Sequence, residues 1–228
     1  MSFTAQLKEY ISTLEVSEFG FADISAAKPG TLFDEQPGTE TFNTAISIVI
    51  KLSSAVLKGI TDKPTHYYFH HYRTVNTHID SILLKIGLFL EQNGYGYFPV
   101  GASQSINGYQ GVFPHKTAAR LAGLGYIGKN AMFISDKFGM GVRLGTLLTD
   151  APLETASELS NGSCGNCSLC VNACPAMALT GENFSPDNPE AALIDRHTCS
   201  EYMKDNFQRI GRGSVCGICM RNCPKLYL

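Results

Sequence analysis

The chain has 228 residues, of which 44% are hydrophobic and 17% are charged, a composition typical of a globular protein with a core of its own. The formal net charge is −2, so the chain carries no general basic field that would recruit nucleic acid. No apolar run approaches the roughly 18 residues that a membrane helix requires. We therefore expect one large domain or two small ones, without a membrane partner.

The N-terminal part of the chain alternates helical and strand patterns. Apolar residues at helical spacing open the chain, and the β-branched run over residues 45–50 is typical of a central, buried strand. Asn93 and Gly94 predict the end of a second amphipathic helix. The expected elements are helices near residues 7–14, 79–90 and 117–122, strands over 20–24, 45–50, 95–100, 132–135 and 142–148, and loops over 26–40 and 101–113. This alternation predicts an α/β sandwich.

All eight cysteines lie in the last third of the chain. Residues 164–175 read C-x2-C-x2-C-x3-C-P, Cys199 stands alone, and residues 216–224 repeat the end of the motif as C-x2-C-x3-C-P. This spacing is that of bacterial ferredoxins with two iron–sulfur clusters. Eight thiolates match the needs of two [4Fe–4S] clusters, and none is left over.

The spacing also predicts which thiolates share a cluster. Three cysteines of one run bind one cluster, while the fourth, which we expect to begin a helix pointing away, reaches the other cluster. One cluster is therefore expected on Cys164, Cys167, Cys170 and Cys223, and the other on Cys174, Cys199, Cys216 and Cys219.

Cysteines at such spacings have two alternative uses. Four disulfides would suit a secreted chain, but no secretory signal is recognisable at the N-terminus and the first 163 residues contain no Cys, which favours reduced thiols in a cytoplasmic compartment. A zinc site also uses C-x2-C pairs, but the two C-x3-C-P endings favour clusters.

Residues 123–128 read G-x-G-x-x-G, the letters of a dinucleotide-binding fingerprint. That fingerprint must follow a strand and open a helix, whereas a helix is expected before this motif and a short strand after it. The preferred interpretation is a glycine-lined loop that lets the backbone approach a flat cofactor or a cluster.

Charge separates along the C-terminal part. Residues 151–195 carry six acidic side chains and no Lys or Arg, whereas residues 196–228 carry six basic side chains against Glu201 and Asp205. This pattern describes either solvated surface or cations that raise a cluster potential or guide an acidic electron-transfer partner.

The segment from Ala118 to Asn130, the strand Arg143–Thr149 and the cysteine pattern with its lone Cys199 together resemble epoxyqueuosine reductase and, more distantly, the reductive dehalogenases. The resemblance implies a nitroreductase-like α/β domain that holds cobalamin, over residues 1–155, followed by a two-cluster ferredoxin-like domain over residues 156–228. The cofactor-binding residues that it implies are Gly123, Gly125, Gly128, Lys129 and Asn130. Arg143 and Lys129 are either solvated or contact an anionic group of the cofactor.

The resemblance also points to a catalytic acid. Tyr109 stands where the family has its proton-donating Asp, while the family's Asp-Tyr-His segment falls near residues 74–76, which contain neither an acid nor a histidine. The chain ends at Leu228 without the C-terminal helical repeats of the tRNA-modifying enzyme. We therefore expect tRNA not to be the substrate. Tyr109 can equally be an ordinary core or surface aromatic.

Three functions remain open. The first is an oxidoreductase in which the clusters pass electrons to a corrinoid, for reduction of an unidentified small-molecule or protein substrate, with ferredoxin or flavodoxin as external donor. The second is an electron-transfer or corrinoid-reducing protein that turns over no small molecule. A third reading makes the α/β domain a docking module whose clusters are structural or sense redox state.

Overall fold

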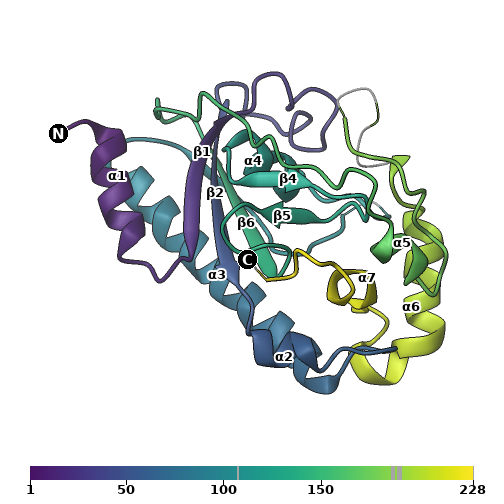
Figure 1. Ribbon diagram of the computed structural model, residues 1–228. Coiled ribbons are helices and arrows are strands. Elements are labelled where there is room, and N and C mark those ends of the chain that lie inside the picture. Colours follow the sequence, from purple (N-terminus) through teal and green to yellow (C-terminus); the bar gives the residue numbers. More distant parts are fainter. Residues whose placement is uncertain (107, 186–187, 189–191, 228) are drawn as a thin grey trace. The chain divides into compact units, whose positions relative to one another are not determined.

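The computed structural model describes residues 1–106, 108–185, 188 and 192–227 (Figure 1). The described chain divides into two compact units. Unit 1 comprises residues 1–50, 75–124 and 143–160, and unit 2 comprises residues 51–74, 125–142 and 161–228. All eight cysteines belong to unit 2.

Unit 1 is built on a four-stranded sheet in the order β1-β2-β6-β3. Strand β1 (Glu18–Asp23) pairs antiparallel with β2 (Thr44–Lys51), and β3 (Tyr97–Val100) pairs antiparallel with β6 (Val142–Thr149). Six consecutive residues of β2 are buried, which is why its sequence reads as an unbroken apolar run. The predicted central strand over residues 45–50 is confirmed.

Helices cover both faces of this sheet. A Cβ added at Gly145 of β6 would meet Ile79 of α3 (His66–Gln92) at 2.5 Å. A Cβ added at Gly20 of β1 would meet the carbonyl oxygen of Ala122 at 2.9 Å, directly after α4 (His115–Leu121). Successive side chains of a strand point to opposite faces of the sheet, so Ser47 and Ile48 of β2 point to opposite faces. Gly145 lies against the Ile48 side chain, whereas Gly20 is the partner of Ser47 across β1 and β2. Helices α3 and α4 therefore lie on opposite faces, as Figure 1 shows.

Helix α1 (Phe3–Ser12) packs on α3. The Tyr10 and Phe89 rings stack with centroids 4.5 Å apart, and the Tyr10 hydroxyl donates to the carbonyl oxygen of Lys85. Leu7 and Ile11 are completely buried, so the predicted N-terminal helix is confirmed. It ends at Ser12, before Leu14.

Helix α3 begins far earlier than the predicted residue 79. It contributes residues 66–74 to unit 2 and residues 75–92 to unit 1. Its first turns are aromatic and polar and show little apolar periodicity, which is why the sequence pattern missed them. Tyr68 is nevertheless buried. The predicted end at Gly94 is confirmed, since this residue adopts a φ of +83°, and Tyr95 N–H donates to the carbonyl oxygen of Leu90.

Unit 2 contains short elements joined by long loops. They are α2 (Ser54–Lys58), β4 (Gly125–Ile127), β5 (Phe133–Ser135), α5 (Leu169–Asn172), α6 (Arg196–Gly211) and α7 (Ile218–Arg221). Strands β4 and β5 pair antiparallel, and α5 packs against α7. A buried cluster of Ile127, Ala131 and Leu193 joins the β4–β5 hairpin to the loop before α6.

Backbone hydrogen bonds attach the C-terminal segment to the residues that follow β5 in unit 2. Met140 and Gly141 donate their N–H groups to the carbonyl oxygens of Lys225 and Leu226. A Cβ at Gly139 would lie 2.2 Å from the Lys225 carbonyl oxygen, so this approach requires glycine. Within the described residues, every helix is too short or too polar to cross a membrane.

Candidate iron–sulfur site

All eight cysteines are free thiols in this structure. Each of the two C-P-terminated motifs contains a short helix, and this helix carries the second-last cysteine of its motif. Cys170 lies in α5 and Cys219 lies in α7. The helices end at Asn172 and Arg221, so Cys174 and Cys223 follow them. The expectation that the fourth cysteine begins a helix is therefore wrong. The Pro after each final cysteine lacks an N–H group, which suits the end of a helix.

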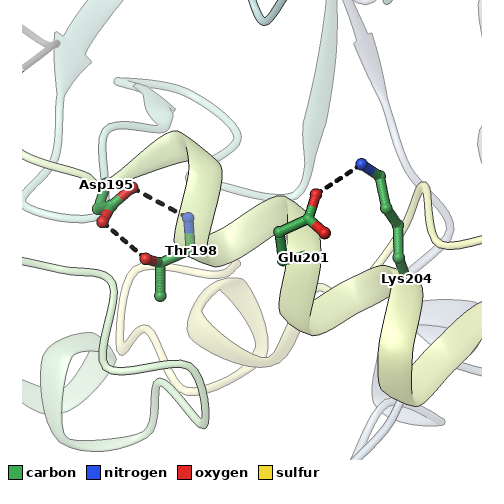
Figure 2. Close-up of polar contacts among 4 residues, drawn as sticks. All are labelled: Asp195, Thr198, Glu201 and Lys204. Atoms are coloured by element: carbon green, nitrogen blue, oxygen red, sulfur yellow. Dashed lines mark hydrogen bonds and ion pairs between the residues drawn. The ribbon is translucent and has the colours of Figure 1, made fainter.

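Cys199 reaches the site from helix α6, which the sequence patterns missed. Asp195 caps this helix, because its carboxylate accepts hydrogen bonds from Thr198 N at 3.0 Å and from the Thr198 hydroxyl at 2.6 Å (Figure 2). These bonds lower the pKa of Asp195. The cap places Cys199 in the first helical turn. An Asp three residues before a Thr is a usable signal for a helix cap. However, α6 is mostly polar, so its sequence shows no apolar residues at regular helical spacing.

Four thiols lie within electrostatic reach of one another and form a first cysteine set, which comprises Cys164, Cys167, Cys170 and Cys223. Burial raises the pKa of Cys223, and the neighbouring Cys164 and Cys167 raise it further. Burial likewise raises the pKa of Cys170, with added charge repulsion from Cys164 and Cys223. Cys223 is thus the neighbour of cysteines some 53 to 59 residues earlier in the chain.

A second cysteine set comprises Cys174, Cys199, Cys216 and Cys219. Burial raises the pKa of Cys219 to about 12, with contributions from the charges of Cys216, Cys174 and Cys199. The pKa of Cys199 rises to about 11 for the same reasons, and Asp195 adds to the repulsion. These two sets are the groups that the spacing predicts. Ligation itself stays a prediction.

The donor chemistry of both sets fits [4Fe–4S] clusters. Backbone N–H groups of Val171, Ile218 and Lys225 donate to the sulfur atoms of Cys170, Cys216 and Cys223, and such bonds stabilise cluster-bound thiolates. Burial disfavours thiolates that lack a positive partner, and iron supplies that charge. The two C-x3-C-P endings favour clusters over zinc, whose C-x2-C pairs lack them.

The glycines of residues 123–128 are explained by close packing within the chain. Gly123 adopts a φ of +71° after α4, where Leu124 N–H donates to the carbonyl oxygen of Ala119. A Cβ at Gly125 would lie 2.1 Å from the carbonyl oxygen of Ile134 in the paired strand. A Cβ at Gly128 would lie 3.5 Å from the Cys164 sulfur. As expected, a helix precedes the motif and a strand follows it, and its last glycine approaches the first cysteine set.

Lys129 and Asn130 are both buried. The Asn130 amide oxygen accepts from Met132 N–H and its nitrogen donates to the Met140 sulfur, so this side chain holds the turn between β4 and β5. Ala131 in the same turn has a φ of +57°. Cofactor binding by Gly123, Gly125, Gly128, Lys129 and Asn130 stays a prediction.

Tyr109 lies in the loop between β3 and α4 and is 41% exposed. Two side chains, those of His115 and Arg143, anchor the start of this loop in unit 1. The partly buried ring of His115 bonds through Nε2 to the Gly101 carbonyl oxygen and through Nδ1 to the Thr146 hydroxyl. Arg143 donates to Asn76 and to the Ser103 hydroxyl. Burial lowers the pKa of His115 to about 4. Sequence reasoning missed His115, because a single histidine carries no pattern.

The comparisons with known proteins agree with this geometry. Residues 163–225 match the family described as the 4Fe-4S double cluster binding domain. An epoxyqueuosine reductase of Staphylococcus aureus is 35% identical over 117 residues, which is 50% of this chain and 30% of that protein. The chain is thus similar to the epoxyqueuosine reductases over about half of its length. The predicted resemblance and the presence of a two-cluster domain are confirmed.

Two solved structures share the fold over 96% of this chain. One is an epoxyqueuosine reductase with an epoxyqueuosine-modified tRNA stem loop, with a TM-score of 0.64, 17% identity and 64% of its own chain covered. The other is a reductive dehalogenase interpreted in terms of B12-dependent dehalogenation, with a TM-score of 0.76, 18% identity and 31% of its chain covered. These likenesses establish a mixed α/β fold with a cluster domain.

The alignment covers only part of the related reductase, which limits the properties that can be assigned to this chain by similarity. The alignment spans about a third of the length of the curated reductase, so activity, substrate and partners are proposals. The expectation that tRNA is not a partner finds no support among the relatives, since one was solved with a tRNA stem loop.

Proposed function

We propose that this protein is an epoxyqueuosine reductase-like oxidoreductase, in which two [4Fe–4S] clusters pass single electrons to a corrinoid held by a nitroreductase-like domain over residues 1–155. The observation that carries the proposal is the gathering of eight free thiols into two sets of four, within residues that match a double-cluster domain. Reversible one-electron transfer is the chemistry that such clusters supply.

The two cysteine sets are the proposed ligand sets. The first takes three cysteines from residues 164–170 and one from the end of α7, and the second takes Cys174, Cys199 and two cysteines around α7. This crossed arrangement ties each motif to both clusters. Metal binding therefore stabilises the packing of α5 against α7 as well as enabling electron transfer.

The corrinoid part of the proposal rests on the fold. A reductive dehalogenase associated with B12 chemistry aligns with 96% of this chain, and the proposed contacts are Gly123, Gly125, Gly128, Lys129 and Asn130. Of these, Gly128 adjoins the Cys164 sulfur. A cofactor bound by this turn would therefore lie beside the first cysteine set.

Tyr109 is the proposed acid. A two-electron reduction needs a proton as charge develops, and a positioned acid contributes about 10²–10⁴-fold. The Tyr109 ring is partly exposed on the loop over residues 101–113, whose start is anchored by His115 and Arg143. The substrate is an unidentified small molecule or protein, and the electron donor is a ferredoxin or flavodoxin in the cytoplasm.

The deciding experiment uses protein purified without oxygen. Iron and acid-labile sulfide are counted first, and about eight of each per chain are expected from two [4Fe–4S] clusters. Cobalamin is then titrated into the protein while the cobalt-centred absorption bands are recorded. Shifted bands at micromolar cobalamin support the proposal. Intact clusters without any shift at high micromolar cobalamin would reject the corrinoid and favour an electron-transfer protein without small-molecule turnover.

A further inference from the structure

Lys225 is held rigidly beside the first cysteine set. Its ammonium donates to the Tyr126 hydroxyl at 2.7 Å and to the Ser163 carbonyl oxygen at 3.3 Å. Its backbone N–H donates to the Cys223 sulfur, and its carbonyl oxygen accepts from Met140 N–H at 2.8 Å. Four hydrogen bonds thus fix both ends of this residue, although it lies close to the end of the chain.

Tyr126 is fixed in turn by the backbone before Cys164. A Cβ at Gly162 would lie 2.1 Å from the Tyr126 ring, so glycine allows the ring to lie directly on the chain. The Lys225 ammonium is 5.1 Å from the centre of that ring, a distance at which a cation is attracted to an aromatic face. Tyr126 therefore holds the ammonium within electrostatic reach of Cys164 and Cys223.

The second cysteine set has an anionic neighbour. Asp195, which caps α6 four residues before Cys199, adds to the charge repulsion on that thiol. Cys219 lies among three other thiols of its set and is strongly dehydrated. Adding an electron to a cluster adds one negative charge, which a nearby cation stabilises and a nearby anion or a low dielectric opposes.

We infer that Lys225, positioned by Tyr126, raises the reduction potential of the cluster at the first cysteine set above that of the cluster at the second. The inference rests on the proposed presence of both clusters and assigns an order to them. A low-potential donor protein supplies one electron to the second cluster, and this electron passes on to the first cluster. The transfer oxidises the second cluster and reduces the first cluster by one electron each, and no atom is transferred. The reduced first cluster is then adjacent to Gly128, in the turn proposed to contact the cofactor.

The test is a potentiometric titration of the anaerobic protein, followed by electron paramagnetic resonance. The signal that Cys223→Ala abolishes and Cys174→Ala preserves belongs to the first set. In the parent protein this signal is expected to develop first on reduction with dithionite. In Lys225→Gln, the equilibrium constant for reducing that cluster is expected to fall at least tenfold, which is about 59 mV for a one-electron couple. Lys225→Arg keeps the charge and is expected to restore most of the loss.

The matched control is Lys204→Gln on α6, which removes the same charge from an exposed ion pair with Glu201 (Figure 2). It is expected to leave the first signal unchanged. Tyr126→Phe, which frees the ammonium, is expected to lower the potential of the first cluster in the same direction as Lys225→Gln. Equal potentials in the parent and in Lys225→Gln, with eight irons per chain retained, overturn the inference. A parent protein that binds no clusters would instead refute the proposed function, and the iron count distinguishes the two failures.

Discussion

His115 gives a quantitative test of the structure, because loss of hydration around its ring lowers its pKa to about 4. Gly101 offers only a carbonyl oxygen, so Nε2 carries the hydrogen and Nδ1 accepts from the Thr146 hydroxyl. In the unfolded chain a histidine titrates near 6.5. The folded protein therefore binds fewer protons than the unfolded chain between these two values. Stability is fully present above about pH 6.5 and is lost as the pH falls toward about 4.

The size of the loss follows from these two pKa values. Each unit of difference is worth 1.36 kcal/mol, so the complete contribution of His115 is about 3 kcal/mol. Between pH 7.0 and 5.5 the expected loss is about 1.2 kcal/mol. This window stays above the range in which carboxylates protonate, so their effect is small.

The measurement is native-state hydrogen exchange under anaerobic conditions, which reports the free energy of opening without requiring reversible loss of clusters. The amides of β3 and β6 are followed, because these strands flank Gly101 and carry Thr146. The parent protein is compared with His115→Gln, which does not titrate. Burial also lowers the pKa of His71, but this residue contributes equally to both proteins. After correction for intrinsic exchange, identical pH slopes in the two proteins would refute the buried, neutral His115.

Three further outcomes are expected. Cys223→Ala and Cys174→Ala should each reduce the iron content from about eight to about four per chain, with opposite clusters lost, and selective loss of the same cluster in both variants would contradict the crossed ligation. Tyr109→Phe should lower turnover at least about 100-fold once a substrate is known, while cluster content stays unchanged, and a variant as fast as the parent would return Tyr109 to a structural role. Gly125→Ala should destabilise unit 2 by about 3 kcal/mol, because the new Cβ would clash with the Ile134 carbonyl oxygen at 2.1 Å; unchanged exchange of the β4 and β5 amides would contradict this close approach.

Local patterns predicted much of the fold. The run over residues 45–50 is a central strand because burial on both faces demands unbroken apolar residues. Gly94 ends α3 because the left-handed conformation favours glycine. Polar elements were harder to predict. The first turns of α3 and all of α6 form without an apolar stripe in their sequence, so no period revealed them.

The cysteine spacing was informative for a similar reason. Spacings of two and three residues are set by tight loops and single helical turns, so the spacing predicts which thiols share a cluster, and this assignment stays a prediction. The error concerned the helices: α5 and α7 end before the last cysteine of their motifs instead of starting with it. Residue spacing limits the distance between two thiols, but it does not determine which residues between them are helical.

The sequence by itself thus determined the cluster motif, the alternation of helices and strands, and the family resemblance, because each of these is written in residues that are neighbours along the chain. Only the tertiary structure placed Lys225 on Tyr126, 99 residues earlier, and His115 between Gly101 and Thr146. Neither contact leaves a pattern in the sequence. Each exists because packing brings side chains that are distant along the chain together at partly buried positions, where a single charge or hydrogen bond has a larger effect than it has in bulk water.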